Sequence, residues 1–169
     1  MREFSLLVYR YNDRAFTLAL RIIGNRETAE EVVQDAFLKV FRGIPGFRGE
    51  SAFGTWFYRI LYNCCLTRNR KRGDVLMDIH DLPGGEPALD EPLIDQLLEE
   101  RELNAIVSEA VDALPAHLRS VVALYYIEEL TYEQVAEVMD MPLGTVKTHL
   151  FRARKRLKEC LQIRVEEVR

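Results

Sequence analysis

Hydrophobic residues recur at helical spacing through most of the chain, and no segment shows the strict alternation typical of a β-strand. In the first half the apolar stripes predict helices over residues 3–23, 27–42 and 51–70. In the second half they predict helices over residues 103–114, 116–128 and 131–139, and a last one from residue 143 onward. Gly24 and Pro115 stand where the first and fourth of these helices should end. The predicted fold class is therefore all-α.

The last two predicted helices have the pattern of a helix-turn-helix. Thr131 followed three residues later by Gln134 is a capping box, and Pro142 suits the first turn of the next helix. At 100° per residue the buried stripe of that next helix should consist of five residues: Val146, Leu150, Ala153, Leu157 and Leu161. The opposite side should carry four larger or polar side chains: Thr148, Phe151, Arg152 and Lys155.

Basic residues dominate this last helix. Between residues 143 and 158 there are six of them and no acidic residue. A helix of this kind can enter the major groove of DNA, with its first half at base edges and its flanks on phosphates. The alternative is a solvated basic helix at the end of a bundle, which the capped helix and the proline-marked turn before it disfavour.

Charge is distributed unevenly over the 169 residues, whose formal net charge of −4 hides three blocks. Residues 1–72 have a net charge of +6, residues 73–112 of −11 and residues 113–169 of +1. The local charge therefore favours nucleic-acid binding at both ends of the chain although the chain as a whole is acidic.

A second nucleic-acid signal lies in the first half. The helix over residues 51–70 is rich in aromatic residues and ends in a basic cluster over residues 68–72, which suits stacking on unpaired bases and neutralising phosphates. Most of its aromatic residues, Trp56 and Phe53 included, are expected in the core. Phe47 stands in a glycine-flanked loop instead and is the better candidate for a base contact.

The predicted domains are residues 1–72 and 97–169, joined by an acidic linker over residues 73–96. Residues 73–95 contain three prolines, three glycines and seven acidic residues without a basic one, and they lack sustained periodicity. Several apolar residues in this segment favour a linker that docks on its own domains or on a partner over a plain tether.

Composition narrows the function classes further. No run approaches the roughly 18 apolar residues that cross a bilayer, and the N-terminus lacks a signal-peptide core, so we expect a cytoplasmic protein without membrane insertion. Three cysteines, two of them adjacent, give no disulfide framework, and core packing of Cys64 and Cys65 is favoured over redox sensing. The histidines are scattered, so neither a metal nor a cofactor is expected.

Three separated motifs together resemble a known family. They are AEEVVQDAF at residues 29–37, FRGESAFGTW at residues 47–56 and GTVKTHLFRAR at residues 144–154, with the acidic linker between the second and third. In this order and spacing the chain resembles an alternative RNA polymerase sigma factor of the extracytoplasmic-function class, and the resemblance covers nearly the whole chain.

The resemblance implies a role for each motif and a set of partners. The first helical domain would bind core RNA polymerase at the β′ clamp helices through Gln34, Asp35, Phe37, Leu38 and Phe41. It would capture the melted −10 promoter strand through Phe47, Arg48, Gly49, Ser51, Asn63, Arg68 and Arg70. The C-terminal domain, adjoining the polymerase β flap, would read duplex −35 DNA through Lys147, Thr148, Phe151, Arg152, Arg154 and Lys155. The acidic linker would imitate RNA in a basic polymerase channel, and an anti-sigma factor is an expected further partner.

Other classes remain as alternatives. A conventional helix-turn-helix regulator would bind duplex DNA without polymerase, usually as a dimer on spaced half-sites. It would not need the Phe47 loop. An adaptor protein could use the same helices for protein contacts alone, but it would leave the basic helix without a purpose. An enzyme is disfavoured because no nucleophile, metal-ligand or phosphate-loop pattern is present in the sequence. Gly54, inside a predicted helix, is an unexplained feature that could adjust the base pocket.

Overall fold

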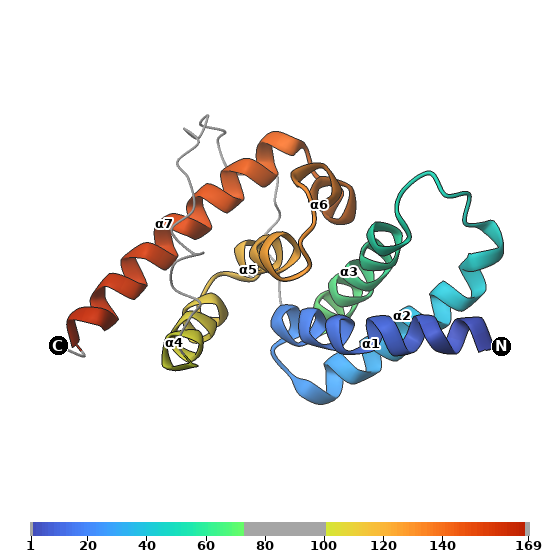
Figure 1. The fold of residues 1–169 in the computed structure, drawn as a ribbon, viewed down its shortest axis with the longest axis horizontal. Coiled ribbons are helices and arrows are strands. Elements are labelled where there is room, and N and C mark those ends of the chain that lie inside the picture. The colour runs from blue at the N-terminus through green and yellow to red at the C-terminus, as the bar shows by residue number, and fades with distance from the viewer. Residues whose placement is uncertain (1, 73–100, 168–169) are drawn as a thin grey trace.

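A computed structural model describes residues 2–72 and 101–167 of the chain. Every regular element over these two ranges is helical, which confirms the all-α prediction. The predicted linker over residues 73–96 lies outside the described residues and stays a prediction. The described helices form two groups, one before and one after residues 73–100 (Figure 1).

The first group is a three-helix bundle. It consists of α1 (Arg2–Ile23), α2 (Arg26–Gly43) and α3 (Phe53–Arg72), with a single 3-10 turn, η1 (Ile44–Gly46), after α2. The Asn25 side chain caps α2 by accepting a hydrogen bond from the Thr28 backbone amide at 2.9 Å. The apolar face predicted for α2 is buried, from Ala29 to Val40, against α1 and α3.

The second group contains α4 (Arg101–Asp112), α5 (Ala116–Val122), a π-helical turn η4 (Ala123–Ile127), α6 (Tyr132–Met139) and α7 (Leu143–Glu167). The capping box at the start of α6 is present as predicted. The Thr131 hydroxyl accepts from the Gln134 amide at 3.3 Å, and the Gln134 side chain accepts from the Thr131 amide at 2.9 Å. The long helix α7 packs on α4, α5 and α6.

The helix predicted over residues 116–128 is present over residues 116–127, but it is not α-helical throughout. Regular α-helix stops at Val122, and the Glu128 amide donates instead to the carbonyl of Ala123, five residues earlier, at 3.1 Å. A π-turn adds one residue to the helical turn and so shifts the direction of the side chains that follow it. Here it accompanies the burial of Glu128, whose side chain is only 5% exposed.

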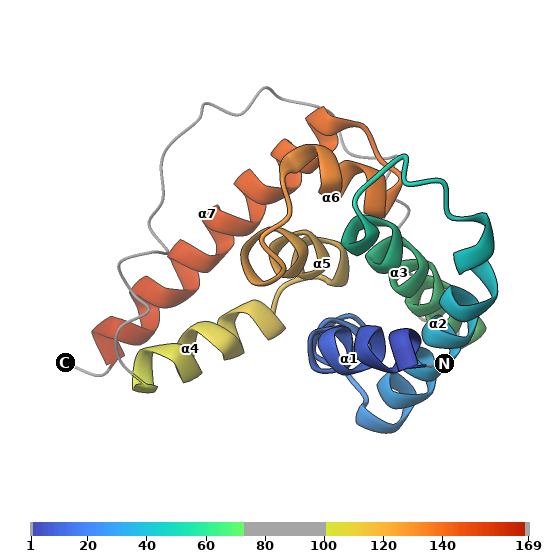
Figure 2. The ribbon, with the colours of Figure 1, turned by 45° about the vertical axis from the view of Figure 1, so that its right-hand side comes forward.

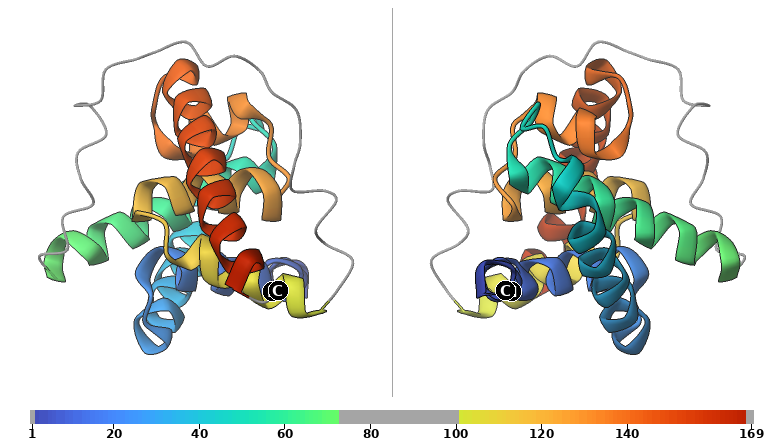
Figure 3. Two further views of the ribbon diagram at one scale, coloured as in Figure 1. Left: turned by 90° about the vertical axis from the view of Figure 1, so that its left-hand side faces the viewer. Right: turned by 90° about the vertical axis from the view of Figure 1, so that its right-hand side faces the viewer.

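The two groups pack against each other through a continuous core. Helix α6 lies along α3, and α5 and η4 lie against α1 (Figure 2). The end views in Figure 3 place α7 on the outer side of the second group, with α1, α2 and α3 on the far side of α5 and α6. The arrangement leaves one side of α6 facing the loop after η1.

Candidate functional site

The turn between α6 and α7 orients the long basic helix. Asp140 ends α6 in the left-handed conformation, with φ of 52°, and the amide of Met141 donates back to the carbonyl of Ala136 at 3.1 Å. Asp tolerates this conformation better than most residues because its short polar side chain interacts locally. The turn thereby sets α7 against α6, and Val146 and Leu150 of α7 are fully buried.

The two faces of α7 divide largely as the sequence predicted. Val146, Leu150, Ala153 and Leu157 are buried, whereas Leu161 is only partly buried at the edge of the core, which corrects the predicted stripe at its last position. On the other side, Phe151 is 43% exposed and Lys155 is exposed. Lys147, Thr148 and Arg152 are half-buried.

The surface near the start of α7 is not covered by other side chains at Gly144. A side chain at Gly144 would meet nothing within 4 Å, so the backbone there is accessible to a large molecule. The Thr148 hydroxyl donates to the Gly144 carbonyl at 2.9 Å, which directs the hydroxyl along the helix. A partner that approached this face would meet helix backbone at Gly144 first, then Phe151 and the basic side chains.

Arg154 differs from the other predicted DNA contacts on α7. Its Nε donates to the hydroxyl of Tyr126 at 2.7 Å, and its guanidinium lies 5.7 Å from the centre of the Tyr126 ring. The ring of Tyr125, stacked on Tyr132 at a centroid distance of 4.8 Å, is 6.0 Å from the same guanidinium. In this structure the half-buried Arg154 therefore joins α7 to η4, and its contact with DNA stays a prediction.

His149 occupies the buried side of α7, a position that the sequence analysis did not assign. Its side chain is 1% exposed, and its ring lies 5.1 Å from that of His117 on α5. Burial, together with the neighbouring His117 and Arg152, lowers the pKa of His149 to about 4. The imidazole is therefore neutral at pH 7 and acts as a packing group beneath the basic face.

A cavity of about 330 Å³ lies where the loop after η1 faces α6. Its lining comes from residues of the loop, of α3 and of α6: Gly46, Phe47, Arg48, Glu50, Ser51, Trp56, Arg59 and Glu137. The ring centroids of Phe47 and Trp56 are 4.8 Å apart with planes tilted by 34°, and Phe53 meets Phe47 edge-on at 5.9 Å. An aromatic wall thus stands beside two guanidinium groups, a combination that suits a base and its phosphate.

Glycines shape this loop at two positions. Gly49 has φ of +72°, a conformation that other residues rarely adopt, so the loop turns there at no steric cost. At Gly43 a Cβ would lie 3.1 Å from Cζ2 of Trp56, so the lack of a side chain lets the indole close onto the end of α2.

The residues predicted for −10 DNA are only partly brought together. Phe47, Arg48 and Ser51 line the cavity, and Gly49 lies in the same loop. Asn63, Arg68 and Arg70 lie on later turns of α3, where Asn63 and Arg70 are exposed and Arg68 forms an ion pair with Glu31 of α2.

Five residues that line the cavity were absent from the predicted −10 set: Gly46, Glu50, Trp56, Arg59 and Glu137. Trp56 was expected in the core and is half-buried, and Arg59 was not considered, although its spacing of three from Trp56 places both on one helix face. Glu137 carries no signal in the sequence, because only the packing of α6 brings it to the loop.

The surface predicted for polymerase contact lies on α2. Gln34, Asp35, Leu38 and Phe41 are exposed, the last two by 54% and 53%, whereas Phe37 is 9% exposed and packs on Phe57 at 5.2 Å. Phe37 is thus placed to support the surface from beneath, and direct contact through its ring is limited by its burial. Leu6 and Tyr9 of α1, exposed by 68% and 87%, are further apolar residues of the first group that the sequence analysis did not single out.

The adjacent cysteines are both buried, as the packing interpretation expected. Burial raises the pKa of Cys65 to about 12, so its thiol is a poor nucleophile at neutral pH. Lys39 donates from Nζ to the sulfur of Cys64 at 3.3 Å, and this contact ties α2 to α3. Within residues 2–72 and 101–167 no three potential metal ligands come together. None of the helices described for the chain combines the length and apolar character needed to cross a bilayer.

Comparison with known proteins accounts for both helical groups. A family model described as sigma-70 region 2 matches residues 7–75, and one described as sigma-70, region 4 matches residues 104–157. RNA polymerase sigma-H factor of Pseudomonas aeruginosa is 36% identical over 95% of this chain and 87% of its own length. The ECF RNA polymerase sigma-E factor of Haemophilus influenzae is 37% identical over 95% of this chain and 88% of its own length.

A solved structure has the same overall fold. The sigma factor RpoE of Bartonella quintana, crystallised in complex with the anti-sigma factor NepR, superposes with a TM-score of 0.71 over 96% of this chain and 99% of that one, at 24% identity. The two matched regions correspond to the two groups of helices, and the sequence relatives align along nearly the full chain. The chain therefore belongs to the extracytoplasmic-function sigma factors of the sigma-70 family, which are non-enzymatic subunits that direct RNA polymerase to promoters.

Proposed function

We propose that the two helical groups divide promoter recognition, with the first holding core polymerase and melted −10 DNA and the second reading duplex −35 DNA. The observation that carries this proposal is the cavity at the loop after η1, where the aromatic pair Phe47 and Trp56 stands beside Arg48 and Arg59. A flipped base needs a stacking partner and a neutralised phosphate, and together these offset the few kcal/mol lost on unstacking. Promoter opening by this route requires no catalytic residue.

The first half of α7 is the proposed reader of −35 DNA. Phe151 and Lys155 are exposed there, Lys147, Thr148 and Arg152 lie beside them, and the surface is open at Gly144. This geometry suits a helix whose N-terminal half meets base edges in the major groove. Arg154 contributes through its hold on Tyr126, which fixes the orientation of α7 for that task.

The exposed side of α2 is the proposed contact with the β′ clamp helices of core polymerase. Leu38 and Phe41 supply apolar area there, flanked by the polar Gln34 and Asp35. Exposed large apolar residues mark interaction surfaces on soluble domains. The C-terminal domain would lie at the β flap, and the segment over residues 73–96 would follow the polymerase channel.

An anti-sigma factor is the proposed regulator, since the structurally similar RpoE of Bartonella quintana was crystallised with one. The protein would act in the cytoplasm, where polymerase and promoters are. Membership of the sigma factor family favours this set of partners over a conventional helix-turn-helix regulator that works without polymerase.

In vitro transcription with core polymerase tests the proposal. Transcription from a pool of promoter fragments identifies a responsive promoter, which is then supplied in duplex form and with the −10 region already unpaired. Phe47→Ala should abolish most transcription from the duplex promoter. The same variant should transcribe much better from the template with the unpaired −10 region, because only the opening step is lost. Phe16→Ala, which truncates another half-buried aromatic residue away from the loop, is the matched control. Equal loss on both templates, or no loss on either, would refute the role of the loop.

A further inference from the structure

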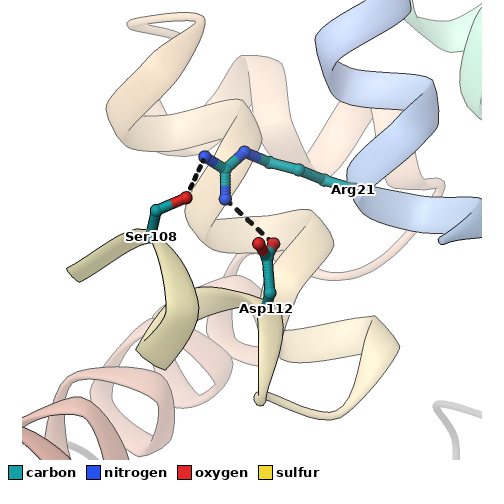
Figure 4. A network of polar contacts seen from close by, with 3 residues as sticks. All are labelled: Arg21, Ser108 and Asp112. Carbon is teal, nitrogen blue, oxygen red and sulfur yellow. Dashed lines mark hydrogen bonds and ion pairs between the residues drawn. The ribbon is translucent and has the colours of Figure 1, made fainter. Parts of the chain in front are cut away.

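Arg21 of α1 reaches across to α4 of the second helical group. Its Nη1 forms an ion pair with Asp112 at 3.1 Å, and its Nη2 donates to the Ser108 hydroxyl at 3.3 Å (Figure 4). The Nε–H of the same guanidinium is buried and has no hydrogen-bond partner among the described residues. Because the Arg21 side chain is only 19% exposed, this unused donor lies in a place largely closed to water.

A second guanidinium with an unused donor belongs to Arg119 of α5. Its Nε is also buried without a hydrogen-bond partner in the described part of the chain. Burial lowers the pKa of Arg119, and the charge of Asp112 opposes this change while that of Arg21 adds to it. Helices α1 and α5 are in contact, and both of these charges act on Arg119. The two guanidinium groups and the carboxylate therefore form one cluster at the junction of α1, α4 and α5.

This cluster carries more positive than negative charge. Arg21 and Arg119 supply two positive charges, and Asp112 supplies one negative charge, which is already paired with Arg21. Buried donors without a partner are rare in native proteins, and a bound water or ion is a common explanation for them. A water molecule would satisfy the donors and leave the charge unchanged. An anion with several oxygens would accept from both Nε–H groups and neutralise the excess positive charge.

We propose that Arg21 and Arg119 form a binding site for a phosphate dianion at the junction of the two helical groups. Phosphate suits the site because the planar guanidinium fork matches pairs of phosphate oxygens. The ligand is inorganic phosphate or the phosphoryl group of a small metabolite, since the partial burial of Arg21 favours a small molecule. A bound anion would join α1 to α5, so its concentration would set the stability of that junction. The site shares no residue with the Phe47 cavity or with the exposed face of α7.

Calorimetric titration and thermal unfolding of the full chain test the site. The two probes are inorganic phosphate and glycerol 3-phosphate, which has no base that the Phe47 cavity could stack, and chloride keeps the ionic strength constant. Saturable binding should raise the thermal midpoint, because a ligand that binds only the folded chain stabilises it. Equal affinity for both probes would assign the site to the phosphoryl group itself, and tighter binding of glycerol 3-phosphate would assign it to a phosphorylated metabolite.

Three variants have different expected effects on phosphate affinity. Arg119→Gln should weaken binding by about 10-fold or more, the range expected for a hydrogen bond to a charged group. Asp112→Asn should tighten binding, because it removes a negative charge from the cluster and keeps an acceptor for Arg21. The Asp112 side chain is 52% exposed, so this variant should fold normally. Arg10→Gln, at an exposed position of α1, is the matched control and should leave the affinity unchanged.

NMR signals of the arginine Nε–H groups locate the bound ligand. Addition of phosphate should shift the signals of Arg21 and Arg119 and leave that of Arg10 in place. The inference would be overturned if neither probe bound saturably, or if Arg119→Gln bound phosphate as tightly as the unaltered chain. Shifts confined to the arginines of α7 would also overturn it, because phosphate would then be bound by the basic helix.

Discussion

The carboxylate of Glu128 accepts a hydrogen bond from the hydroxyl of Tyr58, and the two residues come from different helical groups although both are buried. Burial raises the pKa of Glu128 above its ordinary value, with Glu129 raising it further and the Tyr58 bond and Arg14 of α1 opposing the change. The other oxygen, Oε1, is buried without a hydrogen-bond partner among the described residues. Packing of the two groups against each other therefore raises the proton affinity of the Glu128 carboxyl.

This pKa gives the closure of the two groups a pH dependence with a defined sign. A group whose pKa is raised on closing stabilises the closed form below its ordinary pKa and loses that contribution as pH rises through the raised value. We expect the radius of gyration of the free protein to decrease as pH falls from neutrality toward about 4.5, the ordinary range for Glu.

Glu128→Gln isolates this effect, because the amide keeps an acceptor for Tyr58 and carries no charge. The variant should be as compact at neutral pH as the unaltered protein is in mild acid, and its compactness should no longer depend on pH over this range. A variant that keeps the full pH dependence would assign it to other groups. The measurement is scattering across a pH series with both proteins.

The second helical group should lose stability in mild acid because of His149. Its pKa is lowered to about 4. Between about pH 4 and pH 6.5 this histidine is therefore protonated in the unfolded chain and neutral in the folded chain. Stability is therefore fully present above pH 6.5 and falls by on the order of 3 kcal/mol as pH drops to 4. His149→Gln should flatten this part of the profile in thermal unfolding, and a profile unchanged by the substitution would contradict the assignment.

Arg154 and Lys155 are neighbours on α7 with opposite expected roles. Arg154→Ala removes the bond to Tyr126 and the contact with its ring, which should lower the free energy of unfolding by about 1–2 kcal/mol. Lys155→Ala, at an exposed position, should leave stability within about 0.5 kcal/mol and weaken promoter binding by holoenzyme with a reduced salt dependence. Denaturant unfolding and filter binding over a salt series measure the two effects. Tyr126→Phe removes the hydrogen bond but keeps the ring, so it should reproduce part of the stability loss and leave promoter binding unchanged.

Truncation of the exposed apolar residues on α2 should weaken polymerase binding without unfolding the protein. Leu38→Ala and Phe41→Ala remove side chains that are more than half exposed, so the free chain should change little in stability. Together they should raise the dissociation constant for core polymerase by 10-fold or more, on the order of 1–2 kcal/mol per central interface residue. Fluorescence titration with core enzyme measures this, and Phe151→Ala, which exposes no new core, serves as the control surface change.

Gly54→Ala should stabilise the protein, against the expectation that this glycine shapes the base pocket. A Cβ at Gly54 would lie 3.5 Å from the Tyr11 hydroxyl, an ordinary contact, and Gly54 does not line the cavity. Alanine in a helix is favoured over glycine by about 1 kcal/mol, which corresponds to a rise of several degrees in thermal midpoint for a domain of this size. A lower thermal midpoint, or altered promoter opening, would support the interpretation that Gly54 shapes the base pocket.

The sequence determined the elements that depend on local periodicity and capping. The helices, the capping box at Thr131 and the apolar stripe from Val146 to Leu157 follow from spacing that each segment carries by itself. The basic face of α7 follows in the same way, because side chains at positions three and four apart share one face of a helix. Phe47 was indicated by its place in a glycine-flanked loop instead. The π-turn at residues 123–127 was not predicted from the sequence. It accompanies the burial of Glu128, which depends on contacts with distant residues.

The tertiary structure alone decided which of these groups meet. Arg154 has the charge of a DNA contact but donates a hydrogen bond to Tyr126. Phe37 was expected both in the core and at the surface, and it is buried. Glu137 lines the cavity at the Phe47 loop because α6 packs on α3. Tyr58 and Glu128 are 70 residues apart, and no periodicity within either segment encodes their contact. Local patterns record which face of a helix is apolar, whereas the partner of that face is chosen by packing and polar pairing between distant segments.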